Sequence, residues 1–68
     1  MLKVATAEAV REGVRITMCE DIPANIIKGC NLMSLAGPWS VVRVESKRTV
    51  IVRGGEGIPA RNELFMGV

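Results

Sequence analysis

The stretch WSVVRVESKRTVIVRGGEG, residues 39–57, decides the fold of this chain. Val42 and Val44 alternate along its first part, and Val50 and Val52 alternate along its second part. Because successive side chains of a strand point to opposite faces, each pair of valines lies on one face. The polar residues ESKR between the pairs are few enough for a hairpin loop. The stretch therefore predicts a β-hairpin whose even-numbered valines fill the core.

The same alternation places a second apolar set, Trp39, Val41 and Ile51, on the opposite face of the predicted hairpin. One interpretation is that the N-terminal segment or residues 30–36 cover this set. Another is a subunit or partner interface, since apolar patches rimmed by charge mark such sites. A third is an indole that stacks on single-stranded nucleic acid.

The length of 68 residues predicts a single domain over 1–68. Chains this short bury only about 60% of their unfolded surface and usually need additional stabilisation. Nearly half of the residues, 49%, are hydrophobic, although the chain has only one Trp, one Phe and no Tyr. We therefore expect a homo-oligomer or a protein partner to supply the missing burial.

The chain contains two cysteines, Cys19 and Cys30, and no histidine. Two cysteines alone cannot make a tetrahedral zinc site, and no histidine is present to activate a thiol. No signal peptide and no apolar run of membrane-spanning length is visible. We therefore expect a cytoplasmic protein with no cofactor, no bound metal and no membrane contact. In that compartment we expect the two cysteines to be reduced rather than joined in a disulfide.

The segments before the hairpin alternate between clear and ambiguous patterns. Val14, Ile16 and Met18 share one face of a predicted strand over 14–19. The other expectations are an extended lead-in over 1–5, a short helix or turn over 6–12, one helical turn over 23–28 ended by Gly29, and a strand or loop over 31–36.

After the hairpin, residues 54–57 (GGEG) predict a flexible turn rather than a phosphate-binding loop, because no helix follows them. Residues 58–61 predict a short edge strand, where Pro59 is tolerated. Leu64 and Phe65 are expected to fill the core from a final turn. The adjacent carboxylates Glu20 and Asp21 point different ways and are rejected as an acid–base or metal pair.

The order of these elements resembles a known class. Gly13 precedes the strand VRITM, and Gly37-x-Trp39-x-Val41-Val42-x-Val44 precedes the hairpin loop, the Val50-x-Val52 strand, a glycine turn and Leu64. Over about residues 9–65 this pattern resembles the small SH3-like β-barrels, including KOW-type and Tudor-like modules and small barrels encoded by phages or plasmids. The resemblance implies a mostly β fold, a barrel of about five strands with one or two short helical turns.

Basic residues form the second candidate site. The chain has nine basic and seven acidic side chains, a net charge of +2, and the excess lies in its second half. One interpretation of the set is a solvated sheet edge. The alternatives are contact with phosphates of nucleic acid, or with an acidic protein surface. The set consists of Arg43, Lys47, Arg48 and Arg53.

The expected function is that of a small non-catalytic binding module, a regulatory factor that contacts another protein or itself, of a kind that phages or mobile elements encode to act on host machinery. The first alternative is a barrel that binds a nucleic-acid backbone weakly. The second is an oligomeric enzyme with an active site in a shared pore. Aromatic-cage and proline-peptide recognition are disfavoured, because one Trp, one Phe and no Tyr cannot line such sites.

Overall fold

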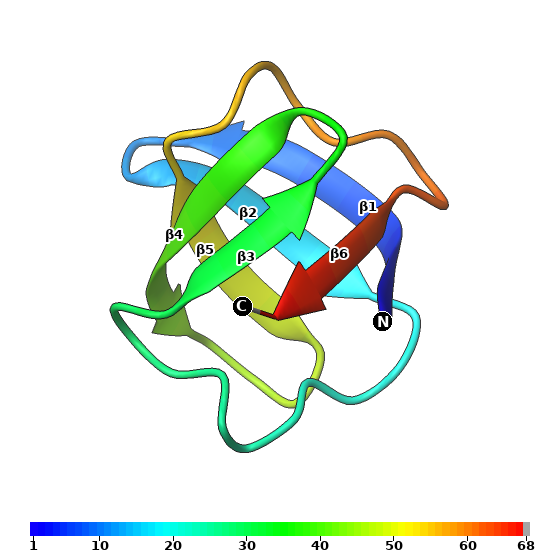
Figure 1. The fold of residues 1–68 in the computed structure, drawn as a ribbon, viewed down its shortest axis with the longest axis vertical. Coiled ribbons are helices and arrows are strands. Elements are labelled where there is room, and N and C mark those ends of the chain that lie inside the picture. Colours follow the sequence, from blue (N-terminus) through cyan, green and yellow to red (C-terminus); the bar gives the residue numbers. More distant parts are fainter. Residues whose placement is uncertain (68) are drawn as a thin grey trace.

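The structure is a computed structural model that describes residues 1–67, which form a closed antiparallel β-barrel (Figure 1). Around the barrel the strands follow the order β1-β2-β5-β4-β3-β6. The predicted small, mostly β barrel is confirmed, and the fold is consistent with an SH3-like barrel. The strands are β1 (Leu2–Val10), β2 (Gly13–Met18), β3 (Asn31–Ser34), β4 (Gly37–Val44), β5 (Thr49–Arg53) and β6 (Leu64–Gly67).

The structure differs from the prediction in the number of strands and in the absence of helical turns from residues 1–67. The barrel has six strands rather than about five, and residues 1–67 contain no helix. The short helix or turn expected over 6–12 is instead a strand as far as Val10, because β1 pairs with β2 from Val4 opposite Met18 to Val10 opposite Gly13, and only residues 11 and 12 form a turn. Pairing with a neighbouring strand overrides the weak local preference of residues 6–12 for a helix. Since this part of the chain has no helix, none is long and apolar enough to cross a membrane.

The predicted hairpin is present as β4 and β5, but a β-bulge interrupts it. Val41 lies opposite Val52, whereas Arg43 already lies opposite Ile51, and Val44 lies opposite Val50. One residue is therefore inserted between Val41 and Arg43. Beyond an inserted residue the side chains of a strand alternate in the opposite phase, so odd-numbered and even-numbered residues change faces.

The orientation of β4 before the bulge differs from the prediction. Trp39 is 1% exposed and joins Val41 in the core, so the prediction that these two face outward is wrong. Val42 is only half-buried, so its predicted place in the core is wrong. Val44 lies on the predicted face, opposite the buried Val50, but it is 38% exposed at the end of β4. In β5 the predicted burial of the even-numbered valines is confirmed, because Val50 and Val52 are fully buried in the core.

The structure also shows the conformation of the segments whose sequence pattern was ambiguous. Residues 23–28 form turns instead of a helical turn, and Ile26, whose N–H donates to the Pro23 carbonyl, is buried against the core. Residues 31–34 are a strand. Residues 58–61 are not, so the predicted edge strand is wrong. Leu64 and Phe65 lie in β6 rather than in a turn.

Strand β6 closes the barrel and positions the surface described below. It pairs with β1 through Leu2 and Phe65, and with β3 through Met33 and Met66. Figure 1 shows it between these two strands. Because side chains alternate, Phe65 is buried in the core while its neighbours Leu64 and Met66 are exposed. The expectation that Leu64 also fills the core is therefore wrong.

Candidate binding surface

The indole of Trp39 lies inside the barrel and is held from three sides. Its Nε1–H donates to the Ser34 hydroxyl over 2.8 Å, and its ring lies 6.0 Å from the Phe65 ring at an angle of 48°. On another side, Gly55 approaches so closely that an added Cβ would lie 2.0 Å from the indole Cε2. The glycine turn thus covers the tryptophan. An indole enclosed in this way is not available to stack on a nucleotide or to contact a partner.

Ile51 faces outward as predicted but is not exposed. It lies opposite Arg15 of β2 and Arg43 of β4, and it is fully buried although it is not part of the barrel core. Long arginine side chains cover apolar surface with their aliphatic stems while their charged ends stay in water. The predicted apolar patch of Trp39, Val41 and Ile51 is therefore not a surface of this structure.

The arginines over Ile51 are held by a chain of ion pairs. Arg15 binds Glu45 over 2.9 Å and Glu8 over 2.8 Å, while Arg43 binds Glu12 and Glu45. The hydrogen bond from Arg15, above all, lowers the pKa of Glu45 below its ordinary value. The pKa of Arg15 is raised chiefly by its hydrogen bond to Glu45, and that of Arg43 chiefly by its hydrogen bond to Glu12.

The four predicted basic contacts are therefore not one free cluster. Arg43 is engaged by two carboxylates, and Arg48 binds Asp21 over 3.0 Å. Lys47 and Arg53 are exposed and make no ion pair within residues 1–67. Arg43 and Trp39 are both odd-numbered residues of β4 but lie on opposite faces, because the bulge between Val41 and Arg43 leaves Trp39 facing the core and turns Arg43 outward.

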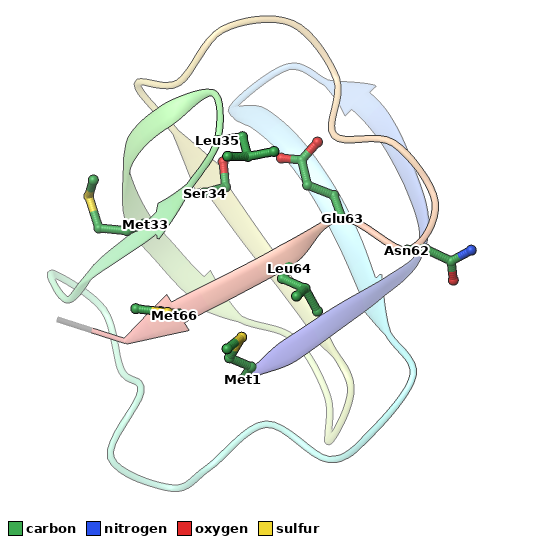
Figure 2. Close-up of a pocket in the computed structure, with 8 residues that line it drawn as sticks. All are labelled: Met1, Met33, Ser34, Leu35, Asn62, Glu63, Leu64 and Met66. Atoms are coloured by element: carbon green, nitrogen blue, oxygen red, sulfur yellow. The ribbon is translucent and has the colours of Figure 1, made fainter.

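An apolar surface that the hairpin pattern does not predict lies on the other side of the barrel, around β6. A groove of about 530 Å³ runs between the start of β1, the β3–β4 turn and β6 (Figure 2). Its apolar side chains are all exposed, and Leu35, in the turn, is 99% exposed. We call this surface the β6 groove; its apolar lining residues are Met1, Met33, Leu35, Leu64 and Met66.

The alternation of two short strands produces the β6 groove. Leu32 of β3 and Phe65 of β6 point into the core, so Met33 and the flanking residues of β6 point outward. Leu35 lies in the turn that connects β3 to β4. The sequence signal was the three large apolar residues Leu32, Met33 and Leu35 within 31–36: the structure buries Leu32 but leaves Met33 and Leu35 uncovered.

Three polar residues complete the lining: Ser34, Asn62 and Glu63. The Ser34 hydroxyl accepts hydrogen bonds from Trp39 Nε1 and from the Ala36 N–H, so it is already engaged. Glu63 Oε1 accepts from the Ala60 N–H, and Glu63 Oε2 is buried without a hydrogen-bond partner in the described part of the chain. In Figure 2 the Glu63 carboxylate lies at the Leu35 end of the groove.

The chemistry available at the β6 groove is that of apolar contact. Methionine side chains are flexible and polarizable and adapt to varied partner surfaces. Across residues 1–67 no three acidic, cysteine or histidine side chains cluster in a way that holds a metal ion. The cysteines are unbridged; Cys19 is exposed and Cys30 is half-buried against the core.

Comparison of the chain with protein-family models, with curated proteins and with solved structures finds no match. A function for this chain is therefore inferred from the residues of the barrel alone.

Proposed function

We propose that this protein is a small, non-catalytic binding module that contacts another protein through the β6 groove. The observation that carries the proposal is the concentration of exposed methionine and leucine side chains on one side of a chain of 68 residues. Contiguous exposed apolar surface on a small domain marks an interaction site. Methionine and aromatic residues are also enriched where proteins meet.

The other candidate, binding to a nucleic-acid backbone, has less support. Phosphate contacts need cationic side chains that are free to replace counterions. Two of the four predicted contacts, Arg43 and Arg48, are engaged by carboxylates, and Trp39 is enclosed in the core. Lys47 and Arg53 alone would give only a weak, salt-sensitive attraction.

Site-specific photo-crosslinking in the native cell tests the proposal. A photoreactive side chain is placed at Met66 on β6 and, as a matched control, at Arg53 on β5, which lies across the barrel from β6 in the strand order. Both positions are exposed, Arg53 at the end of β5 and Met66 one residue before the end of β6. We expect discrete protein adducts from position 66 and none from position 53. Adducts from position 53 alone, or nucleic-acid adducts from position 53, would refute the proposal.

A further inference from the structure

We infer that the occupant of the β6 groove is the same groove of a second copy of this chain, in a two-fold symmetric dimer. This inference rests on the proposed function and names its partner. In a two-fold interface the same patch is used by both copies, so the patch has to be complementary to itself in charge and in shape. The β6 groove meets both conditions.

The first condition is charge. Of the eight residues that line the groove, Glu63 is the only ionisable one apart from the amino group of Met1, and one of its oxygens already accepts from the Ala60 N–H. Two copies of this surface therefore face each other with little like-charge repulsion. The side around Ile51 differs, because Arg15 and Arg43 are ion-paired there and a second copy on this side would have to take these ion pairs out of water.

The second condition is shape. Leu35 projects from the β3–β4 turn with 99% of its surface exposed, and it stands at one end of a hollow of about 530 Å³. Figure 2 shows Leu35 at this end, while Met1, Leu64 and Met66 gather over β1 and β6. A projection beside a hollow on one face lets each copy place its leucine in the hollow of the other. Both contacts form together when the copies are related by a two-fold rotation.

The apolar composition of the β6 groove supports a homodimer. The exposed fractions of the five apolar lining residues add up to about three whole side chains per copy. Homodimer interfaces are more apolar than transient ones, so a surface made of these side chains suits a second copy of the chain. Small domains commonly gain the burial that they lack through oligomerisation. A second copy supplies a matching apolar surface at the same concentration as the first.

Sedimentation of the full chain tests the inference, with substitutions at two exposed apolar positions. Leu35→Asp places a charge in the interface, whereas Ile58→Asp, the matched control, changes an exposed apolar side chain that does not line the groove. We expect the wild-type chain and Ile58→Asp to approach twice 7.3 kDa in the micromolar range. We expect Leu35→Asp to stay monomeric, because its dimer dissociation constant rises at least about 100-fold when two buried leucines are lost per dimer.

Folding of the variants is checked by the emission of Trp39, the only tryptophan, and Met66→Asp serves as a second groove variant expected to be monomeric. A wild-type chain that stays at 7.3 kDa through the micromolar range, equal dissociation by Ile58→Asp, or an open-ended series of larger species would overturn the dimer. A monomer that still forms adducts with another protein from position 66 would overturn the dimer alone. A dimer that survives both groove variants would overturn the role of the groove.

Discussion

Substitution of Gly55 by alanine tests how the glycine turn encloses Trp39. A Cβ at this position would lie 2.0 Å from Cε2 and 2.3 Å from Cζ2 of the indole. Carbon atoms in favourable contact are about 3.5–4.0 Å apart, so either the ring or the turn has to move by about 1.5 Å. The ring is fixed by its hydrogen bond to Ser34 and by Phe65, and we therefore expect the turn to lift.

The expected cost of Gly55→Ala follows from this movement. Forcing extra atoms into a well-packed site costs about 1–3 kcal/mol, and lifting the turn also exposes one face of the indole. We expect a loss of about 2 kcal/mol in the free energy of unfolding. For a domain of 60–100 residues, each kcal/mol lowers the midpoint of thermal unfolding by about 4–8 °C, so the midpoint falls by about 10 °C.

Thermal unfolding followed by tryptophan fluorescence measures both consequences, because Trp39 is the only tryptophan. The folded Gly55→Ala protein should emit at longer wavelength than the wild type, since water reaches the indole. Gly67→Ala is the matched control: no atom lies within 4 Å of its added Cβ, and its backbone needs no positive φ. We expect it to change neither the emission nor the midpoint. A Gly55→Ala protein with wild-type stability and emission would refute the enclosure of Trp39.

Three further predictions concern other parts of the barrel. Glu45→Gln removes the carboxylate between Arg15 and Arg43. Because the pKa of Glu45 in the folded state is lowered from its ordinary value of 4.5, the stabilisation is fully present above that pH and is lost as the pH falls through the lowered pKa. The urea midpoints of wild type and variant should thus differ at neutral pH and converge in acid, and a constant difference would contradict this. Ser34→Ala leaves the buried indole N–H without its acceptor and should cost about 1–3 kcal/mol by urea unfolding, whereas a loss no larger than that of exposed Ser40→Ala would argue against the bond. In the monomeric Leu35→Asp protein, mild peroxide should oxidise Met33 and Met66 before the buried Met18, as read by mass spectrometry, and equal rates would disprove their different exposure.

The sequence was sufficient to predict the barrel and the hairpin, but it did not reveal the phase of β4. Val41 and Val42 are adjacent and both apolar, so alternation is compatible with either of them facing inward. The bulge decides between the two, and it depends on pairing with β5 rather than on a local residue preference. The short helix expected over 6–12 failed for a similar reason, because pairing with β2 outweighs local propensity.

The candidate surface could be predicted only in part. The large apolar residues within 31–36 indicate that Met33 and Leu35 need to be covered, but the covering surface can come from this chain or from a partner. The answer depends on β6, whose register with β1 and β3 turns Met66 outward. The sequence pattern also did not predict that Arg15 and Arg43 cover Ile51, because this burial depends on side chains from three strands.

Methionine-methyl NMR tests most directly whether the β6 groove binds a second copy of the chain. Three of the four methionines, Met1, Met33 and Met66, line the groove, while Met18 is buried in the core and serves as an internal control. On dilution of methyl-labelled protein from above to below the dimer dissociation constant that sedimentation gives, the signals of the three groove methyls should shift and that of Met18 should stay constant. Groove methyl signals that are independent of concentration, or a shift of Met18 equal to theirs, would contradict the binding surface.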